Sequence, residues 1–345
     1  MLMINWVMSR RPVPLSLLDL ALIGPGQAPG DALRGSVSVA QSAEKLGYRR
    51  VWYAEHHNMA TIASSATSVL VAHIASQTRT IRVGAGGVML PNHAPLVIAE
   101  QFGTLEALHP GRIDLGLGRA PGTDPTTTRA LRRDLSSADT FPEDVLELQG
   151  YLTDETRIPG VNATPGRGSK VPLYILGSSL FGARLAAALG LPYAFASHFA
   201  PHDLIDAVAV YRREFLPSKQ LAAPYVIAGL TVIAADTSRH AQEHLRAVQR
   251  MRVNLFLGKG RTFTEEEADA LLESPAGAQL RAMMTYLAVG TADEVHAYVA
   301  KFADHADADE LITVHPAPDL DARLQSIELL AGKSGASASI ASAEA

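Results

Sequence analysis

Gly84-Ala-Gly-Gly-Val-Met-Leu-Pro91 places two adjacent glycines, Gly86 and Gly87, between an apolar run and a helix-forming segment. We interpret the pair as the end of a strand, where the missing side chains let the backbone approach a ligand closely. The same order recurs along the chain: a short apolar run, a polar or glycine-rich turn, and a helical segment. This repeat decides the predicted fold.

Eight strand-like runs carry the repeat. The predicted strands are residues 15–22, 50–54, 80–85, 113–117, 171–176, 193–196, 225–233 and 310–314. The predicted helices are residues 31–46, 65–76, 95–108, 180–189, 201–215, 237–256 and 318–330, and the helix between the fourth and fifth strands is less clear. Nearly all-apolar strands that alternate with helices indicate a parallel sheet covered on both faces. Eight such units in one chain predict an α/β fold of the closed (β/α)₈ TIM-barrel type.

The chain has 345 residues and is 47% hydrophobic, which is enough to bury one large core. We expect a single domain over residues 15–331, with a disordered leader at 1–14 and a disordered Ser/Ala-rich tail at 332–345. Two insertions interrupt the repeat, residues 120–170 after the fourth strand and 257–290 after the seventh. Loops that follow barrel strands form the active site, so both insertions are candidate lids. The alternative is that they only cover the flank of the barrel, as a predicted helix at 142–152 would.

Composition excludes several classes of partner and chemistry. The formal charge of −5 and the absence of Lys/Arg runs argue against nucleic acid as a partner. The chain has no cysteine, which excludes disulfides, thiolate metal sites and cysteine nucleophiles and fits a reducing cytoplasm. The apolar residues 1–8 are too few for a secretion signal or a membrane span. We expect a cytoplasmic protein that binds neither nucleic acid nor membrane.

The second predicted strand ends in Trp52-Tyr-Ala-Glu-His-His-Asn58, which carries two adjacent histidines. Neighbours in an extended chain point to opposite sides, so His56 shares the face of Trp52 and Ala54 while His57 takes the other. This divergence argues against joint metal binding by the two histidines, and we expect no metal site. A histidine at the C-terminal end of a barrel strand is a candidate catalyst, although a structural role is the alternative. His198, after the sixth strand, is a further candidate for the substrate pocket.

Two neighbouring strand ends together predict an anion site. The fourth strand is followed by Arg119, and the fifth ends in Gly177, Ser178 and Ser179 just before a helix. A guanidinium, small hydroxyls and the N–H groups of a helix N-terminus are what a phosphate monoester requires. The alternative is that Ser179 only caps its helix and Arg119 only pairs with an acid such as Asp124.

Four motifs, taken in their order along the chain, resemble those of a known protein family. Glu55-His56-His57, the diglycine stretch, Pro110-Gly-Arg-Ile-Asp-Leu-Gly-Leu-Gly-Arg119 and Pro172-Leu-Tyr-Ile-Leu-Gly-Ser-Ser179 resemble the bacterial-luciferase-like family of flavin-dependent monooxygenases. The similarity spans residues 15–330 and is densest at 39–120 and 171–198. Several matches in the right order carry more weight than any one motif.

The resemblance implies a barrel that binds reduced FMN from a separate flavin reductase, reacts it with O₂ and oxygenates a small organic substrate. It places the catalytic histidine on His56 and the family's non-proline cis peptide on Gly86-Gly87. It places the phosphate-binding arginine on Arg119 and the phosphate-contacting turn on Ser178 and Ser179. His57 and His198 are assigned to the substrate pocket, and a homodimer is expected. Aldehydes, ketones, alkanes and secondary metabolites all remain open as substrates.

The chain also departs from the light-emitting members that it resembles. Gly118 stands where they carry a reactive cysteine, Gly182 where they carry another phosphate-contacting hydroxyl, and His198 where they place an aromatic residue beside the flavin. These departures indicate a single-chain, non-luminescent member. Two alternatives stay open: a deazaflavin-dependent oxidoreductase that transfers hydride on the same barrel, and a flavin-binding protein without turnover.

Overall fold

The computed structural model describes residues 13–24, 26–120, 123–258 and 261–332. The predicted leader and tail lie almost wholly outside these ranges. Within them, nine parallel strands form one sheet in the order β6-β5-β4-β3-β2-β1-β9-β7-β8, and pairing of β6 with β7 closes it. β1 to β7 together with β9 make an eight-stranded barrel, while β8 pairs only with the end of β7. The predicted (β/α)₈ fold is confirmed.

The strands are β1 (Leu15–Asp19), β2 (Arg50–Tyr53), β3 (Arg82–Met89), β4 (Ile113–Gly118), β5 (Leu173–Gly177), β6 (Tyr193–Phe195), β7 (Val226–Ala234), β8 (Leu287–Gly290) and β9 (Glu310–Val314). The helices of the barrel wall are α1 (Pro29–Lys45), α2 (Thr67–Gln77), α3 (Pro95–Leu108), α6 (Leu180–Leu189), α7 (Leu204–Glu214), α8 (Ser238–Leu257), α11 (Ala292–His305) and α12 (Leu320–Ala331). The first insertion holds α4 (Pro125–Ala130), the 3₁₀ turn η2 (Leu135–Ala138) and α5 (Phe141–Leu152). The second holds α9 (Glu265–Glu273) and α10 (Pro275–Ala282) before β8. A short 3₁₀ turn, η1 (Leu90–Asn92), follows β3.

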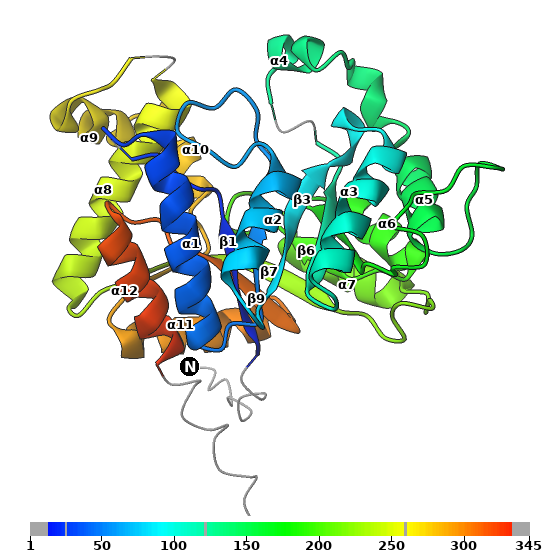
Figure 1. Ribbon diagram of the computed structural model, residues 1–345. Helices are drawn as coiled ribbons and strands as arrows, with labels where there is room; N and C mark the ends of the chain where they lie inside the picture. The colour runs from blue at the N-terminus through cyan, green and yellow to red at the C-terminus, as the bar shows by residue number, and fades with distance from the viewer. Residues whose placement is uncertain (1–12, 25, 121–122, 259–260, 333–345) are drawn as a thin grey trace, which may run out of the picture.

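The helices surround the strands, and α4 and α9 lie beyond the end toward which β3 points (Figure 1). The C-terminal ends of parallel strands meet at this end of a barrel, where active sites form. Both insertions therefore reach the end of the barrel where the sequence places the site. No helix among the described residues is both long and apolar enough to cross a membrane.

The second insertion is more regular than the sequence pattern indicated. Strand β8 was not predicted, because it has only four residues and pairs with one neighbour. Helix α11, which follows it, was not predicted either. The signal for α11 was present: Thr291 and Glu294 form a capping box at its start. The bounds of α3 and α6 were predicted correctly.

The diglycine pair lies inside a strand rather than at its end, which corrects the sequence interpretation. β3 continues through Gly86 and Gly87 to Met89, with a register shift against β4 and a cis peptide between the two glycines. A Cβ at Gly86 would lie 2.8 Å from Cβ of Trp52, and one at Gly87 would lie 2.7 Å from the carbonyl oxygen of Gly116. Glycine is required here because neighbouring strands approach closely.

A buried ionic network fills the barrel at the N-terminal ends of the strands; we call it the barrel floor (Arg50, Asp114, Tyr174 and Glu310). Nη1 of Arg50 donates to Oδ2 of Asp114 at 2.8 Å and to the Tyr174 hydroxyl at 2.7 Å. Its Nε lies 2.8 Å from Oε1 of Glu310. Burial acts to lower the pKa of Arg50, but the carboxylates of Asp114 and Glu310 outweigh it and raise the pKa. The floor is held together by paired charges rather than by apolar packing.

An apolar layer lies above the floor. Leu18, Trp52, Ile227 and Ile312 pack together inside the barrel. The indole N–H of Trp52 donates to Oδ2 of Asp114 at 3.0 Å, which ties this layer to the floor. The predicted site residues lie at the opposite, C-terminal end of the barrel.

We predict that Asp114→Ala destabilises the protein by about 3–5 kcal/mol, because it leaves the buried Arg50 guanidinium without its main partner. Asp154→Ala is the matched control, since Asp154 pairs with Arg167 on the surface and its side chain is 69% exposed. An exposed pair contributes about 0–1 kcal/mol. Urea unfolding of both variants measures the difference, and equal losses of stability would contradict the assigned role of the floor.

Candidate active site

A buried carboxylate joins the loop after β2 to the loop after β3. Oε1 of Glu55 lies 2.8 Å from Nε2 of His57 and 2.8 Å from Nε2 of His93. Its Oε2 accepts the Met89 N–H at 3.0 Å. Burial acts to raise the pKa of Glu55, but hydrogen bonds from His93, His57 and Met89 outweigh it and lower the pKa. Glu55 therefore stays ionised at neutral pH and fixes the orientation of both imidazoles.

Alternation along the extended segment puts Glu55 on the same face as His57, but it gives no indication of His93. His93 lies just beyond the diglycine stretch, after β3. The alternation of side chains along β2 cannot show that a residue after another strand contacts Glu55. The potential ligand atoms of Glu55, His57 and His93 lie within 4.8 Å of one another, which is the spacing of a metal site. His56 is not part of this group, as expected from the divergence of neighbouring residues. The 2.8 Å distances from Oε1 of Glu55 to Nε2 of His57 and of His93 are typical of imidazole N–H groups that donate hydrogen bonds to a carboxylate oxygen.

His56 lies at the C-terminal end of the barrel, on the loop that follows β2. Trp52 and Ala54 belong to the apolar cluster inside the barrel, so the predicted inward face of this segment is confirmed up to Ala54. The backbone N–H of His56 donates to the carbonyl of Ser64 at 3.0 Å, and the side chain is partly exposed. The loop thus presents an accessible imidazole directly after a buried strand.

The first insertion contacts the loop after β2 that carries His56 and His57, which we call the histidine loop. The side-chain amide of Asn58 donates to Oγ1 of Thr127 at 2.9 Å, and the hydroxyl of Thr123 donates to the carbonyl of His57 at 3.1 Å. Asp124 is the N-cap of α4, and hydrogen bonds from Thr127 lower its pKa to about 2. Asp124 thus has its partners within the first insertion and on Asn58, and no ion pair joins it to Arg119 among the described residues.

The residues of the predicted anion site come together across β4 and α6. The guanidinium carbon of Arg119 lies 4.2 Å from the centroid of the Phe181 ring in the first turn of α6. Ser178 and Ser179 are exposed beside it. Ser179 occupies the N-cap position of α6, but its side chain makes no capping hydrogen bond. An exposed guanidinium, two hydroxyls and a helix N-terminus thus lie together at the C-terminal end of adjacent strands, with Gly177 ending β5 beneath them.

His198 follows β6 and packs closely against β7. A Cβ at Gly229 would lie 2.3 Å from Nδ1 of His198, so only glycine leaves room for the ring. This Nδ1 is buried and has no hydrogen-bond partner among the described residues. Burial, with a smaller contribution from the charge of Arg252, lowers the pKa of His198 to about 4. The imidazole is therefore neutral at physiological pH. Arg252 itself, on α8, carried no signal in the sequence.

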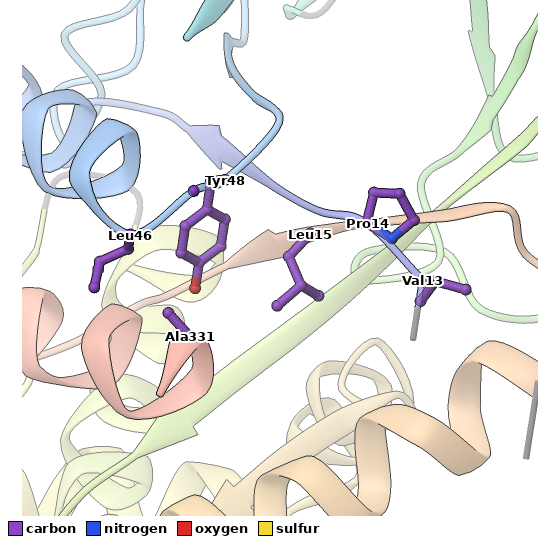
Figure 2. A pocket seen from close by; sticks show the side chains of 7 residues that line it. Val13, Pro14, Leu15, Leu46, Tyr48 and Ala331 are labelled. Atoms are coloured by element: carbon purple, nitrogen blue, oxygen red, sulfur yellow. The ribbon is translucent and has the colours of Figure 1, made fainter. Parts of the chain in front are cut away.

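One pocket lies far from these residues. It is formed by Val13, Pro14 and Leu15 before and within β1, the turn at Leu46 to Tyr48, and Ala331 at the end of α12 (Figure 2). Its side chains are apolar apart from the Tyr48 hydroxyl, which donates to the carbonyl of Ile327 at 3.0 Å. This pocket contains no acid, base or nucleophile, so it does not compete with the C-terminal end as the candidate site.

Comparison with known proteins places the chain among relatives of full length. A family model described as luciferase-like monooxygenase matches residues 14–308. The chain is 45% identical to a luciferase-like monooxygenase of Escherichia coli strain K12, over 93% of this chain and 97% of the relative. It is 33% identical to the N-acetyl-S-alkylcysteine monooxygenase of Bacillus subtilis strain 168, over 92% of this chain and 97% of that enzyme.

Solved structures share the same barrel. The crystal structure of apo-MsnO8 has a TM-score of 0.85 and 35% identity, and the match covers 93% of this chain and 98% of MsnO8. Two structures that are similar in fold alone are the oxygenating constituent of 3,6-diketocamphane monooxygenase from Pseudomonas putida in complex with FMN and an F420-dependent secondary alcohol dehydrogenase. The first has a TM-score of 0.68 and 18% identity over 94% of this chain and 98% of that one. The second has a TM-score of 0.66 and 16% identity over 93% and 98%.

We predict that Glu55→Gln destabilises the protein by about 1–3 kcal/mol at pH 7, because buried donors lose a charged acceptor. The pKa of Glu55 is lowered from its ordinary value of 4.5 in the folded state. Its contribution is therefore complete above pH 4.5 and decreases as the pH falls through the lowered pKa. Urea unfolding between pH 7 and pH 3 measures this.

Glu243→Gln serves as the control, because Glu243 pairs with Arg239 on the surface of α8 and its side chain is 60% exposed. It should change the free energy of unfolding by less than about 0.5 kcal/mol. A difference between wild type and Glu55→Gln that is equally large at pH 7 and pH 3 would refute the role of the ionised carboxylate.

Proposed function

We propose that this chain, which belongs to the luciferase-like monooxygenase family, uses reduced FMN and O₂ to oxygenate a small organic substrate at the C-terminal end of its barrel. Family membership makes it an oxygenating oxidoreductase, which sets aside the alternative of a flavin-binding protein without turnover. The identity of the flavin, the substrate and the roles of individual residues are the parts proposed.

The observation that carries the proposal is the group formed by Arg119, Ser178 and Ser179. Arg119 stacks on Phe181 and has no ion pair or hydrogen bond with any residue in the described ranges. A phosphate monoester fits this group, because it accepts hydrogen bonds from a guanidinium, from hydroxyls and from the free N–H groups of a helix N-terminus. Ser179 leaves its hydroxyl available by not capping its own helix. We assign the phosphate of FMN to this position.

When bound, reduced FMN supplies the electrons that activate O₂. His56 is partly exposed on the loop after β2, and imidazole is the side chain most often used for general acid–base catalysis. The ionised Glu55 orients His57 and His93 and so fixes the loop from which His56 projects. His57 faces the neighbouring strand end and would line the substrate position. Binding energy at the phosphate holds the flavin without taking part in the oxygenation.

The substrate class is open, and one relative offers a direction. The Bacillus subtilis enzyme that is 33% identical acts, by its name, on N-acetyl-S-alkylcysteine, a thioether that carries a carboxylate. Sulfur oxygenation of a small thioether is therefore a reaction to test first. A deazaflavin in place of FMN is the runner-up, because an F420-dependent enzyme shares the fold. A separate flavin reductase, a homodimer and a cytoplasmic location also remain proposals.

We predict that Arg119→Ala weakens binding of FMN about tenfold or more, while binding of riboflavin is unchanged. A charge-assisted hydrogen bond contributes about 1.5–3 kcal/mol, and riboflavin lacks the phosphate that would use it. Flavin fluorescence titrations measure both affinities. The control is Arg184→Ala, since Arg184 lies on α6 with a side chain that is 62% exposed.

Equal loss of FMN and riboflavin binding would place the ring, not the phosphate, near Arg119. Tight binding of F420 in the same titration, with weak binding of FMN, would favour the deazaflavin alternative.

We predict that His56→Ala leaves FMN affinity within about twofold of wild type and lowers oxygenation about 10²-fold or more, since proton transfer by a positioned side chain contributes about 10²–10⁴-fold. The share of consumed O₂ recovered as hydrogen peroxide should rise. An oxygen electrode with a peroxide assay, and N-acetyl-S-benzylcysteine as substrate, measures both. His73→Ala, which changes an exposed residue of α2, is the control. Oxygenation by His56→Ala at the parent rate would end its catalytic assignment.

A further inference from the structure

Glu55, His57 and His93 have the geometry of a metal site as well as that of a hydrogen-bonded group. Oε1 of Glu55 lies 2.8 Å from Nε2 of each histidine, and all three ligand atoms lie within 4.8 Å of one another. Ligands that are about 2.0–2.2 Å from a tetrahedral Zn²⁺ ion lie about 3.3 Å from one another. The distances from Oε1 to the two imidazoles therefore need to lengthen by only about 0.5 Å for these side chains to enclose an ion.

The two imidazoles come from different strand ends. The expectation of no metal site came from His56 and His57, whose side chains diverge because they are neighbours in an extended segment. It does not extend to His57 and His93, which follow β2 and β3. These strands are hydrogen-bonded neighbours in the parallel sheet, so the loops at their C-terminal ends leave the barrel side by side. Both histidines direct Nε2 at the same carboxylate oxygen.

The cluster is buried on its carboxylate side and accessible on its imidazole side. The side chain of Glu55 is 2% exposed, whereas those of His57 and His93 are 19% and 30% exposed. The carboxylate supplies negative charge for a cation, and the partly exposed imidazoles leave a route of entry for it. With three protein ligands, a tetrahedral ion keeps its fourth position for water.

Neighbouring groups hold the ligands of this cluster in place. The Met89 N–H donates to Oε2 of Glu55 at 3.0 Å, so this oxygen is engaged while Oε1 faces the histidines. Nδ2 of Asn92 donates to Oε1 at 3.4 Å, and the Thr123 hydroxyl donates to the carbonyl of His57 at 3.1 Å. Outer partners of this kind orient metal ligands, and their loss weakens metal binding about 10–100-fold.

We propose that Glu55, His57 and His93 bind one Zn²⁺ ion through Oε1 and the two Nε2 atoms, and that the ion fastens the histidine loop to the segment after β3. Two imidazoles and a carboxylate suit Zn²⁺, whereas Mg²⁺ and Ca²⁺ prefer oxygen ligands. Each imidazole binds the ion as a neutral ring that keeps its proton on Nδ1. In the metal-free protein the same atoms make the hydrogen bonds described above. The site needs no flavin, so it is independent of the proposed function.

Isothermal titration with ZnCl₂ tests the site, on flavin-free protein from which a chelator has first removed metal. One ion should bind per chain, and MgCl₂ should show no binding. His93→Gln should weaken Zn²⁺ binding about 100-fold or more, which exceeds the usual effect of losing an outer partner. Its amide keeps a hydrogen-bond donor for Glu55 but removes the imidazole ligand. The control is His240→Ala, which changes an exposed histidine of α8 one turn before His244 and should leave Zn²⁺ affinity unchanged.

Two further measurements test the effect on the loop. Zn²⁺ should raise the unfolding midpoint of wild type and of His240→Ala but not that of His93→Gln, because an ion that binds the folded state stabilises it. Hydrogen exchange of wild type should slow on adding Zn²⁺ at residues 55–58 and 89–93, and change little elsewhere.

Three results would overturn the metal site: no saturable Zn²⁺ binding by wild type, equal binding by wild type and His93→Gln, or loss of binding in His240→Ala. The last would place the ion on the surface of α8. Urea unfolding in the presence of chelator checks that His93→Gln is folded, and His57→Gln replaces it if it is not. The hydrogen-exchange measurement uses wild type alone, so protection that appears away from the two loops refutes the site without any variant.

Discussion

The ion pairs of Arg50 with Asp114 and Glu310 are the constraint on which the rest of the barrel depends. These residues come from β2, β4 and β9, and Tyr174 adds β5, so one guanidinium connects strands separated by up to 260 residues. A buried charge left unpaired is strongly unfavourable, so the strands can close only in the register that brings all of these groups together. This network fills the N-terminal end of the barrel, and the predicted site residues lie at the other end.

The two ends are linked through Trp52. Its indole donates to Asp114 in the floor, and its Cβ occupies the space that a side chain at Gly86 would need. The diglycine segment therefore takes its position from the packing of the barrel interior. Two residues beyond Gly87, Met89 donates its backbone N–H to Glu55, which orients His57 and His93. A continuous series of contacts thus runs from the barrel floor to the histidine loop.

Much of the fold could be predicted from the sequence because strands buried on both faces are mostly apolar and barrel helices alternate with them. The location of His56, Arg119 and Ser179 followed from their places at strand ends. Alternation along one strand cannot, however, identify a partner on another strand, and so His93, Arg252 and the Arg50 network were not predicted. Strand β8 was missed for a related reason, since its pairing with the end of β7 gives it no periodicity of its own.

The histidine loop has two independent supports, and they differ in kind. Glu55 holds it from the barrel side by buried, charged hydrogen bonds. The first insertion holds it from outside through Asn58–Thr127 and Thr123–His57. The outer contacts are neutral and partly exposed, so they contribute less and open more readily than the inner ones. The loop therefore depends more on its buried anchor at Glu55 than on its contacts with the first insertion.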